Sequence, residues 1–564
     1  MKKVLLKLVC LVLCAGLILT GCQKNESKEK QAEDTQKKQS IVTEPGTFPI
    51  VKDKVTLKIF TMQSPQIENL ETNDLTKWYE EKTNVHIEWE QAPQTALDEK
   101  RKLSLASGDY PDVYMASAMT MEEEMLYGPQ GAFIPLNDLI DKQTVTLKKI
   151  FQDDPTTRES VTTLDGNIYS LPNTAGTFHT TLPQKMWINT KWLNKLNLKL
   201  PATTDEFYQV LKAFKEKDPN GNGKSDEIPL VGSKDIGNRT GRVVRVEGFL
   251  MCAFIYNDSE NRFILKDGKI DVAFNKPEWR KGLEYMKKLY TEGLIDTSAF
   301  TMTKEQVKQL IEKADAQIVG AVPQQSPSEI ANMAGERHKD YAALPPLKGP
   351  DGVQTASWYP YQHKPGVYVI TKACKYPEVA MRWVDWFYTM EGTLRSRVGR
   401  EGIEWARAKP GEKSYTGKDA TWIKLTTLGG IQNVSWMALN APNNMLIHSD
   451  QVGDTNIYSA SGLETRLYQA SKLAEPYKPK EVVPPLYMGS SDIQTIAQLQ
   501  TEINSYVNEC IVAFAIGGMD LAKDWDKYIK NLDTMGLKNY LSIYQKTYDQ
   551  FVKVKGTQKA PATK

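Results

Sequence analysis

The sequence predicts a mixed α/β body with at least two lobes. Runs rich in β-branched and aromatic residues, typical of strands, alternate with stretches of helical periodicity over about 500 residues. Such alternation over this length implies strands covered by helices in more than one domain. No unit of fixed length repeats along the sequence, which argues against a solenoid or a propeller.

The first elements of this body are predicted near its start. Residues 55–60 (VTLKIF) form a β-rich run that Ser64-Pro65 closes, and residues 85–89 (VHIEW) alternate between apolar and polar as a strand does. Residues 73–82 between them have helical character. We therefore expect the order strand, helix, strand.

Three longer helices are marked by their starting residues. Thr203 and Glu206 have the spacing of a capping box ahead of an apolar helical pattern. Prolines suit the first helical position, and Pro277 and Pro377 each precede residues that repeat at helical spacing. We expect the last of these helices to end before Gly392.

The N-terminus has the pattern of an export signal. Three lysines are followed by an apolar run, residues 8–19, which as a helix would span roughly 18 Å, short of the ~30 Å membrane core. We therefore expect a cleaved signal peptide over residues 1–21 rather than a permanent span. The sequence LTGC at 19–22 resembles the bacterial lipobox, which implies a lipid on Cys22. An ordinary signal followed by a chance cysteine is the alternative.

The residues after Cys22 are almost entirely polar. Residues 23–48 consist mainly of Lys, Glu, Gln, Asp and Ser, and too few apolar groups are available to offset the entropy of ordering them. We expect a flexible tether over residues 22–49, which would hold the body at the extracytoplasmic face of the cell membrane.

Charge and cysteine usage exclude several classes of protein. The chain has 71 basic and 69 acidic residues, a net +2, and removing three signal lysines leaves about 2 − 3 = −1. This balance offers no electrostatic basis for binding nucleic acid. Outside the signal region only Cys252, Cys374 and Cys510 remain, and their odd number and wide spacing argue against a disulfide scaffold.

Residues 218–227 (DPNGNGKSDE) begin like a calcium-binding loop. Oxygen-bearing side chains stand at positions 1, 3 and 5 with Gly223 at position 6, but position 12 is Pro229 where an EF-hand has glutamate. The loop would therefore close early; an acid-rich turn is the alternative. The candidate ligands are Asp218, Asn220, Asn222, the carbonyl of Lys224, Asp226 and Glu227.

Aromatic residues outside the predicted helices, and polar residues in such irregular segments, are candidate ligand contacts. Trp and Tyr combine an apolar face with a polar tip, which suits a partly wet binding surface. Aromatics within helices at packing periods, such as Trp383, are expected in the core instead. For each residue in an irregular segment the alternative is an aromatic that seals a loop. The candidates are Gln63, Trp358, Tyr361, Arg400, Glu401, Trp405 and Trp436.

Motifs of enzyme chemistry are missing from the sequence. It contains no HExxH, GxSxG or CxxC, and the GKS at 223–225 lacks the glycine that a phosphate-binding loop requires at position 218. A glycoside hydrolase needs only two suitably spaced carboxylates, so that class stays open as an alternative.

Five segments of the body resemble the family 1 extracellular solute-binding proteins of bacterial ABC importers, including the long lipoprotein branch that contains alginate-binding proteins. Together they span most of the mature chain, in the order and spacing of that family. They are LSLASGDYPDVYM (103–115), GAFIPLNDLID (131–141), LDGNIYSLP (164–172), KGLEYMKKLYTEGLID (281–296) and KDWDKYIKNLDTMGLKNYLSIYQKTYD (523–549).

The resemblance implies a two-lobed periplasmic-binding-protein-like fold with hinge crossings and a ligand cleft between the lobes. It implies a monomer that captures an oligosaccharide or other small solute for a permease, without catalysis, and a structural calcium in the loop at 218–227. It also adds Ser107 and Asp109, whose segment borders the cleft in the family. By analogy, we expect one lobe at 50–172 and 316–372, and the other at 173–315 and 373–564.

Two questions stay open at the level of the sequence. The loaded protein could be presented to a sensor instead of a permease. The ligand could be acidic, since cationic partners are available in Arg395, Arg397, Arg400 and Arg407, or it could be a neutral oligosaccharide.

Overall fold

The structure, a computed structural model, describes residues 41–174, 176–234, 244–258, 260–313, 317–489 and 491–558. The chain from Val42 onward forms one compact unit. The predicted signal at 1–21, the predicted lipid site Cys22 and most of the expected tether lie outside the described residues. Within the described ranges, no helix is long and apolar enough to cross a membrane.

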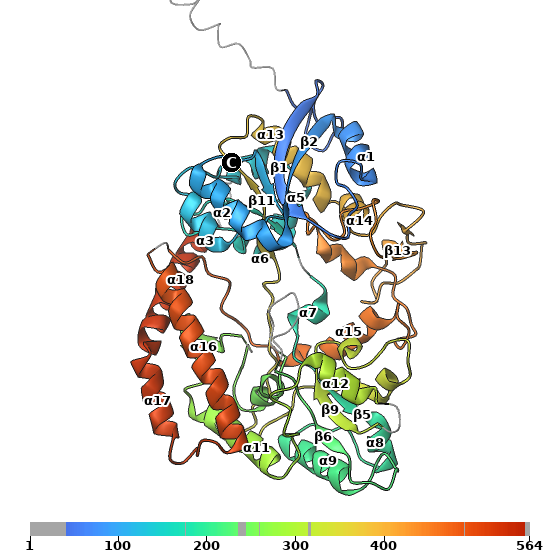
Figure 1. The fold of residues 1–564 in the computed structure, drawn as a ribbon, viewed down its shortest axis with the longest axis vertical. Helices are drawn as coiled ribbons and strands as arrows, with labels where there is room; N and C mark the ends of the chain where they lie inside the picture. The colour runs from blue at the N-terminus through green and yellow to red at the C-terminus, as the bar shows by residue number, and fades with distance from the viewer. Residues whose placement is uncertain are drawn as a thin grey trace, which may run out of the picture. The chain divides into compact units, whose positions relative to one another are not determined.

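A five-stranded sheet in the order β2-β1-β3-β11-β4 organises the first lobe (Figure 1). β1 is parallel to β2 and β3, whereas β11 is antiparallel to β3 and β4. Its strands are β1 (Val55–Gln63), β2 (Val85–Pro93), β3 (Val113–Met115), β4 (Leu171–Asn173) and β11 (Lys364–Ile370). Its helices are α1 (Asp74–Thr83), α2 (Leu97–Ser107), α3 (Met121–Tyr127), α4 (Asn137–Gln143), α5 (Thr146–Asp153), α6 (Pro155–Glu159), α13 (Pro377–Asp385) and α14 (Met390–Arg397). A hairpin of β12 (Trp405–Arg407) and β13 (Trp422–Lys424) follows α14.

A four-stranded sheet in the order β10-β5-β9-β6 organises the second lobe. β6 and β9 are parallel, and β5 is antiparallel to β9 and β10. Its strands are β5 (Met186–Asn189), β6 (Ile228–Leu230), β9 (Val319–Pro323) and β10 (Tyr341–Ala343), with a separate hairpin of β7 (Phe263–Lys266) and β8 (Lys269–Val272). The helices are α8 (Thr190–Lys195), α9 (Thr204–Glu216), α10 (Val246–Leu250), α11 (Pro277–Thr291), α12 (Lys304–Ile311), α15 (Leu463–Lys472), α16 (Ile493–Ile516), α17 (Trp525–Thr534) and α18 (Leu537–Gln558).

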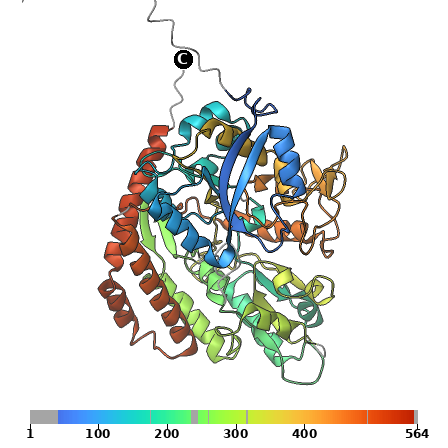
Figure 2. The same cartoon turned by 45° about the horizontal axis from the view of Figure 1, so that its top comes forward.

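The α/β prediction and most of the predicted elements are confirmed. α1 occupies the stretch expected between the first two strands, and Asn73 accepts a hydrogen bond from the backbone of its first turn. Thr203 and Glu206 form the predicted capping box of α9, and α11 begins at Pro277. Figure 2 shows α16, α17 and α18, in red, beside α11, in green; these helices share one hydrophobic core with the second-lobe elements.

The helix predicted from Pro377 to Gly392 is wrong at its C-terminal end. α13 ends at Asp385, a short 3₁₀ turn follows, and a new helix, α14, begins at Met390. Thr389 caps α14 by accepting a hydrogen bond from the backbone N–H of Gly392. The buried Asp385 accepts backbone hydrogen bonds from residues 145–147. The chain therefore turns at a contact with α5 that sequence periodicity does not register.

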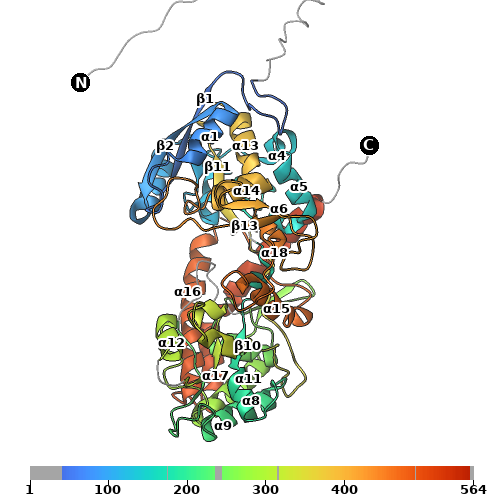
Figure 3. The ribbon, with the colours of Figure 1, turned by 90° about the vertical axis from the view of Figure 1, so that its right-hand side faces the viewer.

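The expected division into lobes is corrected by the strand pairing and the cores. β9 and β10 pair with β5, so only the last part of 316–372 belongs to the first lobe. Trp383 of α13 and Trp436 share a core with β1, and Figure 3 shows α13 and α14 in the lobe that holds β1 and β2. The segment 373–441 therefore belongs to the first lobe, contrary to expectation.

Residues 42–49, expected to be part of the tether, contact the first lobe. Val42 bridges Val51, and the Phe48 ring meets the Tyr79 ring edge-on with centroids 6.4 Å apart. Residues 42–49 thus pack on the first lobe, through these contacts and a backbone hydrogen bond from Thr43 to Ile50.

Candidate ligand-binding site between the lobes

Four segments, here called the connecting segments, lie between the lobes, and three of them share a small apolar cluster. Segments 174–185, 344–363 and 453–462 cross from one lobe to the other, whereas 473–492 links α15 to α16 of the second lobe; segment 174–185 contains a short helix, α7 (Phe178–Thr181). Leu182, Ala356 and Ala474, one from each of three segments, pack together, with Phe178, Trp358 and Tyr477 around them. Movement of one lobe relative to the other must therefore deform or rotate about this cluster.

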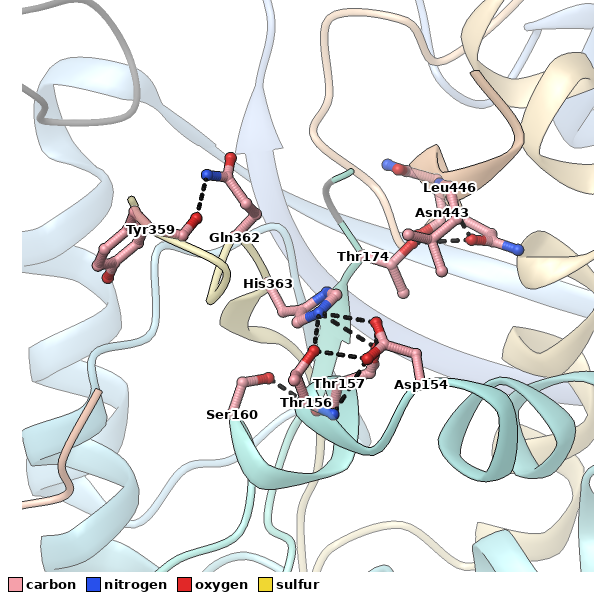
Figure 4. Close-up of polar contacts among 11 residues, drawn as sticks. Asp154, Thr156, Thr157, Ser160, Thr174, Tyr359, Gln362, His363, Asn443 and Leu446 are labelled. Carbon is pink, nitrogen blue, oxygen red and sulfur yellow. Dashed lines mark hydrogen bonds and ion pairs between the residues drawn. The ribbon is translucent and has the colours of Figure 1, made fainter. Parts of the chain in front are cut away.

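Hydrogen bonds between neighbouring segments reinforce the connection (Figure 4). The backbone N–H of Thr174 donates to the carbonyl of Asn443 at 3.2 Å. The Gln362 amide donates to the carbonyls of Thr180 and Tyr359. The bonds from Thr174 to Asn443 and from Gln362 to Thr180 join stretches that are far apart in sequence, whereas the bond to Tyr359 is local.

A hydrogen-bonded cluster around the buried His363 ring anchors the connecting segments to the first lobe. His363 Nε2 lies 3.2 Å from Asp154 Oδ2, and the same nitrogen lies 3.1 Å from the hydroxyl of Thr156. Burial raises the pKa of Asp154, but the hydrogen bonds from His363, Thr156 and Thr157 outweigh burial and hold it well below its ordinary value. Asp154 therefore stays ionised against the segment that enters β11.

The connecting segments attach to one edge of each sheet. β4 is antiparallel to β11, which is antiparallel to β3, so β4 ends at the same edge as β1, β2 and β3. The segment 174–185 leaves this edge and enters β5 at the edge where β6, β9 and β10 end. The carboxyl ends of every strand in the two sheets except β5 and β11 thus face the connecting segments, the place where open α/β folds bind ligands.

A cavity of about 260 Å³ lies at this boundary. Met121 and Glu122 at the start of α3 come from the first lobe, and Trp358 and Tyr359 come from a connecting segment. The other lining residues are Tyr256, Asp258, Glu260, Asn261, Phe263, Val482, Val483, Pro484, Pro485, Leu486, Met488, Ile493, Ile496, Ala497, Gln500 and Tyr544. Closure of the lobes would change this cavity, because both lobes and two connecting segments build it.

The polar groups of the cavity wall are held by local contacts. Asp258 accepts hydrogen bonds from the backbone N–H groups of residues 260, 262 and 263, and burial raises its pKa. The Tyr256 hydroxyl donates to the carbonyl of Trp358, and burial raises the pKa of that phenol well above its ordinary value. The Gln500 amide donates to Asn261. The wall is therefore preorganised, with aromatic faces next to hydroxyl and amide groups.

The predicted contact residues are not all brought together. Trp358 lines the cavity, whereas Gln63, Ser107 and Asp109 are exposed on the first lobe and are not part of its wall. Tyr361 is half-buried, and burial with the nearby Glu159 raises its pKa. The sequence therefore identified one residue of this wall.

Two candidate contacts are corrected to structural residues. Trp405 and Trp436 are each 1% exposed, and the Trp436 ring stacks on Phe387 with centroids 5.2 Å apart. Arg400 binds Glu404 at 3.0 Å, and Glu401 binds Arg407 at 3.1 Å. The aromatic and charged residues of this region stabilise the turn and hairpin that follow α14.

Several residues of the cavity wall were not selected from the sequence. Tyr359 adjoins the selected Trp358, and Pro484-Pro485 in an irregular apolar stretch signals a rigid connecting segment. Tyr256 and Asn261 carry no sequence signal, because only the packing of α16 and α18 places them at the lobe boundary.

The loop at 218–227 gathers its polar side chains around Asp218 and Asp226. Asp218 accepts hydrogen bonds from the backbone of residues 221–223, and the amides of Asn220 and Asn222 donate to Asp226. Glu227 Oε1 is buried without a hydrogen-bond partner, and burial with the charges of Asp218 and Asp226 raises its pKa. In the described part of the chain, no group of three His, Cys, Asp or Glu residues has the arrangement of a metal site.

Comparison with known proteins places the chain in a family. The model of bacterial extracellular solute-binding proteins matches residues 64–393. The fructooligosaccharide ABC transporter substrate-binding protein FusA of Streptococcus pneumoniae serotype 4 is 30% identical over 516 residues, 90% of this chain and 92% of FusA.

Solved structures agree with this assignment. The structure of FusA in complex with kestose has a TM-score of 0.65 and 27% identity, covering 88% of this chain and 99% of FusA; an EF-hand mutant of FusA in complex with fructo-nystose has a TM-score of 0.64, 26% identity and the same coverage. An extracellular solute-binding protein from Bifidobacterium longum subsp. infantis, with a TM-score of 0.72, 23% identity and coverage of 88% and 98%, shares the fold. The chain therefore belongs to the bacterial extracellular solute-binding protein family.

Proposed function

We propose that this protein is a lipid-anchored monomer that captures an oligosaccharide in the cavity between its lobes and delivers it to the permease of an ABC importer. The observation that carries this proposal is the position of Trp358, which lines the cavity and also packs on the apolar cluster of the connecting segments. The sugar-binding relative FusA supports the ligand class.

The chemistry of the cavity wall suits a sugar. The apolar C–H faces of a pyranose or furanose ring stack on flat aromatic side chains, and Trp358 and Tyr359 offer such faces. Sugar hydroxyls exchange hydrogen bonds with amide and phenol groups, which Asn261, Gln500 and Tyr544 supply at the other side. A sugar held in this way would contact the second lobe and a connecting segment, and at Met121 and Glu122 it would also meet the first lobe, which would favour the closed arrangement.

Closure is the signal that a permease can recognise. Because Trp358 belongs to a connecting segment, a ligand that orders its ring also acts on the hinge cluster. The lipid on Cys22 and the residues that follow would keep the loaded protein beside the permease at the outer face of the membrane. The protein itself performs no chemistry on its ligand in this proposal.

We further propose that calcium binds the loop at 218–227 and stabilises it. The loop offers three carboxylates and two amide oxygens, the hard oxygen donors that calcium prefers, and the unpartnered Glu227 Oε1 fits a cation. Burial, together with the charges of Asp218 and Asp226, raises the pKa of Glu227, and a bound cation would offset both effects. The ligands would be Asp218, Asn220, Asn222, the carbonyl of Lys224, Asp226 and Glu227.

Isothermal titration calorimetry with a panel of oligosaccharides tests the capture proposal. We expect one glycan class to bind the purified chain and to be recovered uncleaved. Trp358→Ala should weaken binding at least tenfold because it removes the stacking face, whereas Trp422→Phe, at a buried tryptophan outside the cavity, should leave affinity unchanged. Release of shorter sugars would instead establish a glycoside hydrolase.

A further inference from the structure

We infer that the cavity selects neutral oligosaccharides and rejects glycans that carry carboxylates. This inference rests on the proposed capture of an oligosaccharide at the same cavity. The fold leaves the charge of the ligand open, because two lobes joined by a hinge can close around a charged or an uncharged sugar.

All the charged residues that line the cavity are acidic. Its charged lining residues are Glu122, Asp258 and Glu260, and the described wall contains no Lys, Arg or His. Glu122 is exposed in the first turn of α3, so its carboxylate faces solvent and any arriving ligand. A uronate in this cavity would stand near like charges, and like-charge juxtaposition is a strong source of discrimination between ligands.

The arginines that could have suited an acidic sugar are engaged elsewhere. Arg395 and Arg397 donate to the carbonyls of Val434 and Met437. Arg400 pairs with Glu404 and Asp74, and Arg407 pairs with Glu401. None of these four arginines is among the lining residues of the cavity. They stabilise the region after α14, and the sequence-based case for an acidic ligand therefore fails.

Two further cations, Lys478 and Arg262, lie near the wall but are not among its lining residues. Lys478 is exposed, with its ammonium over one face of the Trp358 ring, 5.1 Å from the ring centroid. Arg262 is buried, donates to Asn508 at 2.6 Å and lies 4.0 Å from Glu247. Arg262 is attracted by both Glu247 and the lining residue Asp258, so the expected repulsion of a uronate depends chiefly on the exposed Glu122.

A matched pair of ligands tests the inference. Each neutral trisaccharide that binds in calorimetry, with 1-kestose, maltotriose and cellotriose as the starting set, is compared with its derivative in which a primary hydroxyl is oxidised to a carboxylate. We expect the oxidised sugar to bind at least tenfold more weakly. We also expect the affinity of the neutral sugar to change by less than about twofold between 50 and 500 mM NaCl, because salt screens charge interactions and a neutral sugar forms no ion pair.

Single substitutions that remove one charge each show which residue weakens the binding of the oxidised sugar. Glu122→Gln should reduce the ratio of the two dissociation constants, oxidised sugar over neutral sugar, at least threefold. Because Glu122 is exposed, the variant should fold normally, which an unchanged melting temperature would show. Lys478→Gln should leave the ratio of the two dissociation constants unchanged. Equal or tighter binding of the oxidised sugar, or of trigalacturonate, overturns the inference while leaving capture intact. If no sugar of either kind binds, the proposed capture function itself falls, and the inference with it.

Discussion

The Tyr487 hydroxyl donates a hydrogen bond to Oε2 of Glu124 at 3.3 Å, joining the segment that walls the cavity to the first lobe. The same carboxylate oxygen accepts a hydrogen bond from Ser170 at 2.8 Å, and Tyr487 is 3% exposed. Residues 482–486 on this segment line the cavity, so the contact connects the ligand site with the interior of the first lobe.

This contact predicts that stability falls as pH rises through neutrality. Burial raises the pKa of Glu124 from 4.5 to about 8, although hydrogen bonds from Ser170 and Tyr487 lower it. The folded state therefore holds a proton that the unfolded chain releases near pH 4.5. The resulting stability is complete below that pH and is lost as pH rises toward 8, by up to about 1.4 kcal/mol per unit.

Urea unfolding at pH 5 and pH 8 measures this effect. Glu124→Gln cannot ionise, so the variant should lose much less stability than the wild-type chain between the two pH values. Glu99→Gln, at an exposed carboxylate on α2, is the matched control and should follow the wild type. An identical pH dependence in Glu124→Gln and the wild type would contradict the assignment.

The calcium proposal predicts that chelation lowers the melting temperature. Excess calcium should restore it, because a ligand that binds only the folded state stabilises that state, by about 2.7 kcal/mol at a hundred times its dissociation constant. The double variant Asp218→Asn with Asp226→Asn should no longer respond to calcium or chelator.

An equally exposed loop aspartate provides the control for calcium. Asp454 also accepts hydrogen bonds from its own loop, yet no second acid raises or lowers its pKa. Asp454→Asn should therefore keep the wild-type calcium response. A response that survives in the double variant would place the ion elsewhere.

The correction of Trp436 predicts a loss of stability without a loss of binding. Its ring is buried against Trp383 and Phe387, and truncation of such a side chain costs about 3–5 kcal/mol. Trp436→Ala should lower the free energy of unfolding by this amount while the folded fraction keeps its ligand affinity in calorimetry. A large change in affinity with little change in stability would instead show that Trp436 contacts the ligand.

The hinge anchor predicts that Asp154 contributes more than its neighbour. Asp154→Asn removes the charge that holds His363 and should cost about 1–3 kcal/mol at pH 7 in urea unfolding. Because the folded pKa of Asp154 is below its ordinary value, this contribution is present above about pH 4 and is lost as pH falls further. Asp153→Asn, which removes an exposed pair with Lys149, should change stability by less than about 0.5 kcal/mol.

Local patterns predicted what local interactions decide. The capping box at Thr203 and Glu206 was visible because both partners lie within one turn. Trp358 was found because an aromatic outside a helix has few local reasons to be there. The helix break before Met390 was missed because helical periodicity continues through it, and the contact that accompanies it, between Asp385 and residues 145–147, joins positions about 240 residues apart.

By itself the sequence determined the class of the fold, the capping of its helices, the composition of the N-terminal region and, through a family resemblance, the two-lobed plan. These follow from periodicity, propensity and charge within short windows. Only the tertiary structure decided that β9 pairs with β5, that Trp436 is core and that the cluster of arginines is neutralised away from the cavity. Each of these depends on which distant side chains meet, because burial and ion pairing are properties of the packed chain and not of any one segment.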